Sequence, residues 1–133
     1  MKSFFSGVVF VSCVLYAAWF FFPIAWPYLY EPETIDILKW SGYGSIINLS
    51  GPIPYLIGVA YLVATVGLLL FKNWGRVLFL MLTVVNAASM PLYGIGIQGP
   101  YESVIGNIVT VCDGVILAMC YLSSVSNEFQ KGT

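Results

Sequence analysis

The chain has 133 residues, of which 59% are hydrophobic and 8% are charged, and its formal net charge is −1. Soluble domains carry about 25% charged residues, so this composition excludes a soluble globular protein. The nearly neutral charge excludes a nucleic-acid-binding role, which requires basic side chains along the phosphate backbone. There is no histidine, which removes the side chain used most often for metal binding and general base catalysis.

Four apolar segments follow one another, at residues 4–22, 52–71, 77–97 and 103–125. Each is close to the roughly 20 residues that a helix needs to cross the hydrocarbon layer. Helices satisfy their own backbone hydrogen bonds in lipid, whereas four strands could not close a barrel. The sequence therefore predicts an all-α integral membrane protein, a single domain built as a four-helix transmembrane bundle of two antiparallel hairpins. We expect the first segment to be retained as a span, because no small-residue cleavage site ends it.

The longest connection is the predicted external loop, residues 23–51. Pro23 and Pro27 are expected to end or kink the first span. Residues 32–40 (PETIDILKW) carry acids early, a lysine late and apolar side chains on one side, which favours a short interfacial helix on the membrane. The alternative is an ordered loop without a helix. The loop also contains Asn48-Leu49-Ser50, formally a glycosylation sequence.

The basic residues predict the orientation in the membrane. Lys2 precedes the first span, and Lys72 and Arg76 lie in the tight turn FKNWGR between the second and third spans. The external loop instead contains more acids than bases. Under the positive-inside rule both termini and the FKNWGR turn face the cytoplasm.

Aromatic and basic residues at the span ends are predicted to anchor the protein at the membrane interface, where rings and cations meet lipid headgroups. The predicted anchors are Lys72, Trp74, Arg76, Trp26 and Trp40. An alternative role for the FKNWGR turn is docking to a cytoplasmic partner.

The last predicted span contains Asp113 near its middle, where an unpaired charge is costly. Asn107, Thr110 and Asp113 recur at spacings of three, which places them along one face of a helix. Counted from the cytoplasmic ends of their helices, Asn86 and Asp113 lie at similar depths, about 15 to 18 Å. We therefore predict an Asn86–Asp113 hydrogen bond between the third and fourth spans, with Ser89 or Thr110 nearby and the acid protonated.

Two interpretations of this polar site stay open. Isolated acids in membrane spans often titrate protons or line a pore. The structural interpretation, in which Asp113 fixes the register of two helices, is favoured because we expect no second buried acid and no buried base for a relay. A seam of small residues in the same span, Thr110, Gly114 and Ala118, recurs at four-residue spacing and is typical of close helix packing.

Catalysis and cofactor binding are not predicted. The serines have no histidine partner, Cys112 and Cys120 are not spaced as a redox pair, and no ligands cluster at metal-binding spacing. We therefore predict no enzyme, no metal and no cofactor.

The segments FKNWGRVLFLMLTVV and DGVILAMCYLSSVSNEF resemble parts of small four-span bacterial inner-membrane proteins that have no assigned activity. The resemblance implies the span count and a bacterial inner membrane. Four short-looped helices barely enclose a cavity, so we predict a non-catalytic protein that acts in the bilayer by self-association or as an accessory subunit of a membrane assembly. The alternative function is a small transporter or an ion or proton channel, with its polar site around Asp113.

Overall fold

The computed structural model describes residues 1–47 and 52–131, so the Asn48-Leu49-Ser50 sequence lies outside the described residues. In the described part every regular element is helical, which confirms the predicted all-α class. The long helices are α1 (Lys2–Phe21), α4 (Ile53–Leu69), α5 (Asn73–Ser89) and α6 (Pro100–Leu122). The shorter elements are the 3₁₀ turns η1 (Phe22–Ala25) and η2 (Met90–Tyr93) and the helices α2 (Trp26–Leu29), α3 (Pro32–Leu38) and α7 (Ser126–Lys131).

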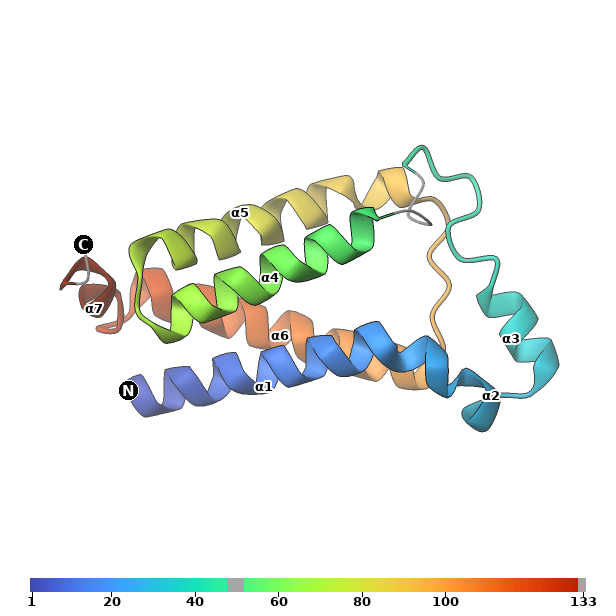
Figure 1. The fold of residues 1–133 in the computed structure, drawn as a ribbon, viewed down its shortest axis with the longest axis horizontal. Helices are drawn as coiled ribbons and strands as arrows, with labels where there is room; N and C mark the ends of the chain where they lie inside the picture. The colour runs from blue at the N-terminus through green and yellow to red at the C-terminus, as the bar shows by residue number, and fades with distance from the viewer. Residues whose placement is uncertain (48–51, 132–133) are drawn as a thin grey trace.

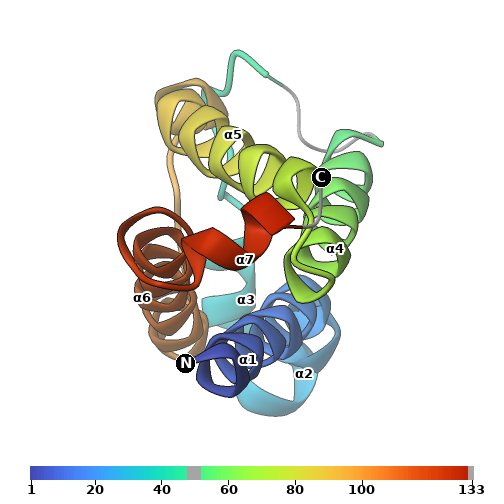
Figure 2. The same cartoon turned by 90° about the vertical axis from the view of Figure 1, so that its left-hand side faces the viewer.

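The long helices lie side by side and alternate in direction (Figure 1). The start of α1, the α4–α5 turn and α7 lie at one end of the bundle, which we call the terminal end. The helices α2 and α3 lie at the opposite end, which we call the loop end. Viewed from the terminal end, α7 lies across the bundle (Figure 2).

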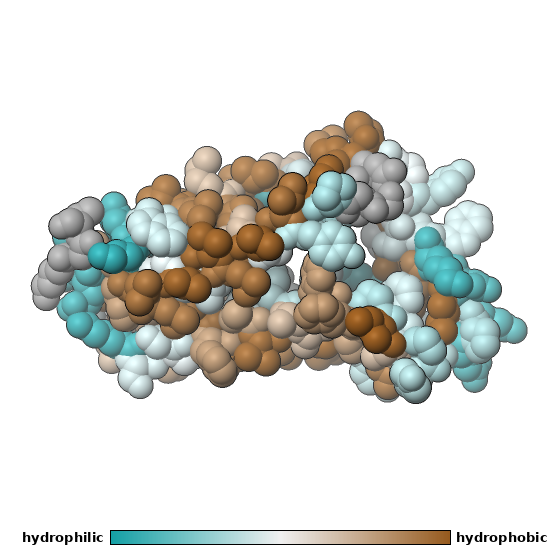
Figure 3. All heavy atoms as spheres, viewed as in Figure 1, coloured by the Kyte–Doolittle hydropathy of each residue, from teal (hydrophilic) through white to brown (hydrophobic). Residues whose placement is uncertain are grey.

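Within residues 1–47 and 52–131, three stretches of helix are long and apolar enough to cross a membrane: Lys2–Leu29, Asn73–Tyr93 and Pro100–Leu122. Helix α4 is also apolar, but it has only 17 residues. Apolar side chains cover the middle of the molecule, and hydrophilic ones gather at its two ends (Figure 3). Such a surface is typical of a multi-pass membrane protein.

The first loop begins and folds as its prolines predict. Helix α1 ends at Phe21, and Pro23 lies in the 3₁₀ turn that follows. Within the predicted interfacial segment, the structure contains α3, with Pro32 in its first turn and Glu33 beside it. The prediction of a helix here is confirmed. The location of this helix on the membrane surface stays a prediction.

The third predicted segment, 77–97, is wrong at both ends. Helix α5 begins earlier, at Asn73, and ends at Ser89, followed by η2. Residues beyond Tyr93 leave the helix because Pro91 has no N–H to donate and Gly94 adopts a positive φ of 76°. This stretch pairs with the first loop instead: the Gly42 N–H donates to the Ile95 carbonyl at 2.8 Å, and the Ile95 N–H donates to the Tyr43 carbonyl at 3.0 Å.

Helix pairing differs from the prediction of two sequential hairpins. Helix α5 packs along α4, as predicted for the FKNWGR hairpin, but α6 packs mainly along α1 and touches α5 much less. The connection 94–99 is not helical and crosses the loop end, which carries the chain from α5 to the side of α1. The first and last long helices therefore form the second pair.

The hydrophobic core is concentrated near the terminal end. Its buried members are Phe5, Val9, Tyr61, Ala64, Leu68, Phe79, Ile116, Met119, Cys120, Val125 and Phe129. The ring of Phe129 in α7 is fully buried and meets Phe5 edge-on, with ring centroids 5.8 Å apart. Helix α7 thus packs against the terminal end of the bundle and contributes Phe129 to the core.

Gly67→Ala is expected to destabilise the α4–α5 hairpin. An added Cβ would lie 2.7 Å from the Cα of Gly75 and 2.8 Å from the Trp74 ring, and overpacking of this kind costs about 1–3 kcal/mol. Gly7→Ala in α1 is the matched control, because a Cβ there meets nothing within 4 Å. Thermal unfolding in detergent, followed by circular dichroism, should show a lower midpoint for Gly67→Ala only. Equal unfolding midpoints for Gly67→Ala and Gly7→Ala would contradict the close packing of α4 on α5.

Candidate functional site: the buried carboxyl of Asp113

Asp113 lies inside the bundle with 7% of its surface exposed. Both of its carboxyl oxygens have a hydroxyl partner on α1. The hydroxyl of Tyr16 donates to Oδ2 at 2.6 Å, and the hydroxyl of Ser12 donates to Oδ1 at 3.1 Å. The carboxyl group is therefore fully hydrogen-bonded within the chain, as a polar group in an apolar environment must be.

The spacing of residues on α1 explains this geometry. Ser12 and Tyr16 are four residues apart, so both side chains lie on the same face of the helix, toward α6. The ring of Tyr16 also stacks on Tyr61 of α4, with centroids 4.9 Å apart and an angle of 29° between the ring planes. Contacts among three helices thus extend from the carboxyl through Tyr16 to Tyr61, and we call Ser12, Tyr16, Tyr61 and Asp113 the polar centre.

The predicted Asn86–Asp113 hydrogen bond is wrong, because the partners of Asp113 come from α1 and not from α5. Asn86 is half-buried, and its backbone carbonyl accepts from the hydroxyl of Ser89 at 3.0 Å. That hydroxyl also lies 2.6 Å from the Tyr93 hydroxyl. Ser89 therefore makes its hydrogen bonds at the end of its own helix, and it does not contact Asp113.

The structure also divides the predicted polar face of α6, Asn107, Thr110 and Asp113, which we call the polar stripe. Asp113 is buried, whereas Asn107 and Thr110 are exposed on the side of α6 that no other described part of the chain covers. The Thr110 hydroxyl donates to the carbonyl of Gly106 at 2.9 Å, one turn earlier in the same helix. A three-residue spacing rotates each side chain by about 60° from the last, so successive members of the stripe drift away from the buried face.

Sequence reasoning missed Ser12 and Tyr16, although a signal for them was present. The depth argument that linked Asn86 to Asp113 applies equally to Ser12, which lies ten residues after Lys2. Both helices carry a polar group at that depth, and spacing along the chain does not decide which one is the neighbour. The packing of α6 on α1 decides it.

A second buried acid, Glu102, lies in the first turn of α6 and is 7% exposed. Its carboxylate accepts from the Trp26 indole N–H at 2.8 Å and from the Gly99 backbone N–H at 2.8 Å. The second bond satisfies a free N–H at the helix start, and the negative charge is favourable beside the positive end of the helix dipole. Trp26, predicted as an interfacial anchor, also ties α2 to α6.

The other predicted anchors differ in what they contact. Trp74 and Trp40 expose 49% and 63% of their surface, and Lys72 is exposed. Arg76 instead turns inward: its Nε donates to the Asn73 side-chain oxygen at 2.6 Å. Its guanidinium lies 5.3 Å and 5.6 Å from the ring centroids of Tyr121 and Phe129. Arg76 therefore holds α6 and α7 to the α4–α5 turn.

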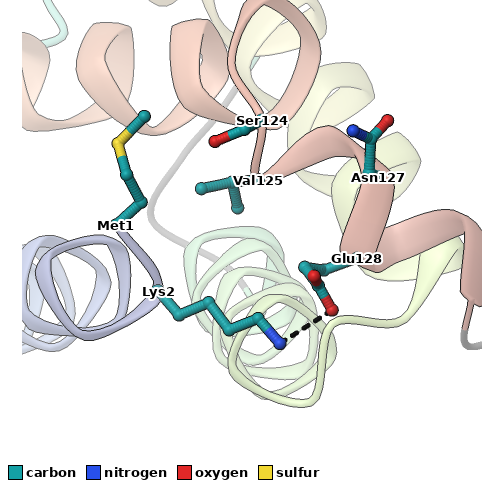
Figure 4. Close-up of a pocket in the computed structure, with 6 residues that line it drawn as sticks. All are labelled: Met1, Lys2, Ser124, Val125, Asn127 and Glu128. Carbon is teal, nitrogen blue, oxygen red and sulfur yellow. Dashed lines mark ion pairs between the residues drawn. The ribbon is translucent and has the colours of Figure 1, made fainter.

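A pocket of about 360 Å³ lies where the start of α1 meets α7 (Figure 4). Its lining residues are Met1, Lys2, Ser124, Val125, Asn127 and Glu128. The ammonium of Lys2 and the carboxylate of Glu128 form an ion pair of 2.7 Å at its edge. The two charged side chains that line this pocket are thus paired with each other.

Among the described residues, no three His, Cys, Asp or Glu side chains come together at a distance that could hold a metal ion. The thiols of Cys13 and Cys112 are half-buried and that of Cys120 is buried, and all three are free. The chemistry available at Asp113 is hydrogen bonding and proton exchange between its carboxyl and the hydroxyls of Ser12 and Tyr16.

The chain matches no protein-family model, no curated protein and no solved structure at a significant level. Any function must therefore be argued from the residues and their arrangement.

The bond between Tyr16 and Asp113 is expected to contribute measurably to stability. A hydrogen bond between membrane helices contributes about 0.6 kcal/mol on average and up to about 1.7 kcal/mol. A double-mutant cycle of Tyr16→Phe and Asp113→Ala, measured by unfolding in mixed micelles, should give a coupling energy in that range.

The control is Tyr93→Phe, which removes a phenol whose hydroxyl is bonded to Ser89 and not to Asp113. Combined with Asp113→Ala, it should show no coupling. A Tyr16 coupling of zero would contradict the observed contact.

Proposed function

We propose that this protein is a non-enzymatic, four-span membrane protein that acts by self-association or as an accessory subunit of a membrane assembly. The observation that carries this proposal is the closure of the polar centre. Both oxygens of Asp113 are bonded within the chain and the side chain is 7% exposed, so its carboxyl joins helices and presents no free group to a ligand. With its inner polar groups used internally, the chain interacts through its outer surface.

The fourth span in this proposal is α4. Its 17 residues extend about 26 Å, somewhat less than the hydrocarbon layer of about 30 Å. It lies beside three helices that are long enough to cross, and a bilayer adapts to a short helix by local thinning at a modest cost. Exposed apolar side chains such as Leu56, Leu62 and Val66 support its placement in lipid.

The proposed orientation has both termini in the cytoplasm. Lys2, Lys72 and Arg76 belong to the terminal end, and Glu31, Glu33 and Asp36 to the loop end. This distribution of charge agrees with the positive-inside rule for cytoplasmic termini. The likeness of two segments to small bacterial inner-membrane proteins is the basis for proposing that membrane, and α3 would then lie on its outer surface.

The alternative function, proton or ion transport at Asp113, requires water or a path of exchangeable protons that leads from the carboxyl to the outside of the bundle. The observed contacts of the carboxyl are the hydroxyls of Ser12 and Tyr16, both from α1. Asp113→Asn distinguishes the two functions, because the amide can accept from one hydroxyl and donate to the other but cannot exchange a proton. In reconstituted vesicles we expect no pH-dependent flux from either protein. Flux that Asp113→Asn abolishes would overturn the proposal in favour of transport.

Cysteine accessibility tests the orientation. In a background without Cys13, Cys112 and Cys120, Asn127→Cys and Tyr28→Cys each place one thiol at an exposed position, at opposite ends of the bundle. A membrane-impermeant maleimide added to intact cells should label Tyr28→Cys, and should label Asn127→Cys only after the cells are opened. The reverse pattern would contradict cytoplasmic termini.

The mass of the purified protein in nanodiscs tests self-association against a partner complex. We expect either a defined number of copies larger than one or a stoichiometric second chain, identified by mass spectrometry. A single copy without any co-purifying chain, across several gentle detergents, would contradict both forms of the proposal.

A further inference from the structure

The polar centre continues beyond Tyr61 into the fourth long helix. The hydroxyl of Tyr61 lies within hydrogen-bonding reach of the hydroxyls of Tyr16 on α1 and Thr83 on α5. Tyr61, Thr83 and Asp113 lie eight, ten and nine residues from the terminal-end limits of α4, α5 and α6. At about 1.5 Å per residue, these three residues share one level of the bundle. We call Asp113, Tyr16, Tyr61 and Thr83, which come one from each long helix, the oxygen chain.

Each contact in the oxygen chain needs one hydrogen, so the hydrogens can be counted. The chain has three contacts, which join Asp113 to Tyr16, Tyr16 to Tyr61, and Tyr61 to Thr83. Thr83 uses its own hydrogen elsewhere, because it donates to the Phe79 carbonyl one turn earlier at 2.9 Å. The two tyrosine hydroxyls supply only two hydrogens for the three contacts. A neutral carboxyl on Asp113 supplies the third, whereas a carboxylate leaves one contact without a hydrogen.

The two oxygens of the carboxyl determine where this hydrogen lies. Ser12 contacts Oδ1 and donates its own hydrogen there at 3.1 Å. The carboxyl hydrogen therefore lies on Oδ2 and is donated to Tyr16 across the 2.6 Å contact. Either oxygen of that contact can carry the hydrogen, and in the carboxylate state it would come from Tyr16. In the neutral state Tyr16 can donate to Tyr61 instead, and Tyr61 can donate to Thr83.

The surroundings of Asp113 favour the same protonation state. No lysine or arginine of the described residues forms an ion pair with Asp113. The residue is 7% exposed and lies in the middle of a span. A buried carboxylate without a counter-charge is costly, whereas a neutral carboxyl needs only hydrogen-bond partners. The hydrogen count and the burial of the group thus lead to the same conclusion.

We propose that the proton of Asp113 is a fixed part of the fold, which starts a one-way chain of hydrogen bonds from Oδ2 through Tyr16 and Tyr61 to Thr83. This chain joins the α1–α6 pair to the α4–α5 pair at one level of the bundle. It ends where Thr83 donates to the Phe79 carbonyl, which accepts hydrogen bonds but has no hydrogen to pass on. The proton therefore holds the two helix pairs together. The inference goes beyond the proposed function, because it concerns the interior of one copy.

Infrared spectroscopy of the full chain tests the protonation state, because a neutral carboxyl has a carbonyl band separate from the bands of a carboxylate. In a maltoside detergent, which has no carbonyl group, we expect this band at neutral pH in the native protein and its loss in Asp113→Asn. Glu102→Gln is the matched control. Glu102 is also 7% exposed but accepts from two N–H donors, so its replacement should leave the band in place. A native spectrum without the band, or a band that Asp113→Asn leaves unchanged, would overturn the inference.

A double-mutant cycle of Tyr61→Phe and Thr83→Val tests whether the chain reaches α5. Unfolding in mixed micelles should show a coupling of about threefold in the unfolding equilibrium constant, as expected for one hydrogen bond between membrane helices. Thr65→Val is the matched control for Thr83→Val. The Thr65 hydroxyl is on α4 and donates to the Tyr61 backbone carbonyl at 2.8 Å, a bond that Tyr61→Phe leaves intact. Tyr61→Phe and Thr65→Val should therefore show no coupling. Equal couplings for the two threonines, or none for Thr83, would overturn the inference.

Discussion

The contact of Asp113 with Ser12 and Tyr16 determines how the rest of the chain can be arranged. It joins the first long helix to the last one, across about a hundred residues of sequence. In lipid, apolar side chains gain little by leaving a neighbouring acyl chain for a neighbouring helix, so hydrogen bonds and close packing decide which helices pair. The two hydrogen bonds from α1 to the carboxyl of Asp113 therefore select α1 as the neighbour of α6. Once α1 and α6 are paired, α4 and α5 are left to pair with each other through their short turn.

The two pairs are then held together mainly at the terminal end. There the ring of Phe129 fills the end of the bundle, Arg76 stacks on Phe129 and Tyr121, and Lys2 meets Glu128. At the loop end Phe20 of α1 meets Tyr55 of α4 edge-on, with ring centroids 5.5 Å apart, and the Gly42 N–H donates to the Ile95 carbonyl. Ring contacts therefore join the two pairs at both ends, and hydrogen bonds between connecting segments are added at the loop end.

Much of this fold could be predicted from composition and from proline and glycine positions, because those depend on local physical chemistry. The helical class, the end of α1 before Pro23 and the helix within 32–40 are examples. The pairing of helices could not be predicted in the same way. Depth along a span is shared by Ser12, Asn86 and Asp113, and choosing between the first two requires the path of the connection 94–99. That path follows from loop-to-loop hydrogen bonds that no periodicity in the sequence reveals.

The helical repeat explains why the predicted polar stripe on α6 is divided between a buried and an exposed side. A helix of 3.6 residues per turn cannot keep Asn107, Thr110 and Asp113 on one narrow line, so a bundle that buries the acid must turn the amide outward. In water an exposed asparagine is ordinary, but within a bilayer the same residue is a hydrogen-bonding group without solvent. The chain satisfies Asp113 and Glu102 from within and leaves Asn107 open. The polar groups of α6 that have partners are therefore those on the side toward α1 and α2, where another helix of the chain reaches them.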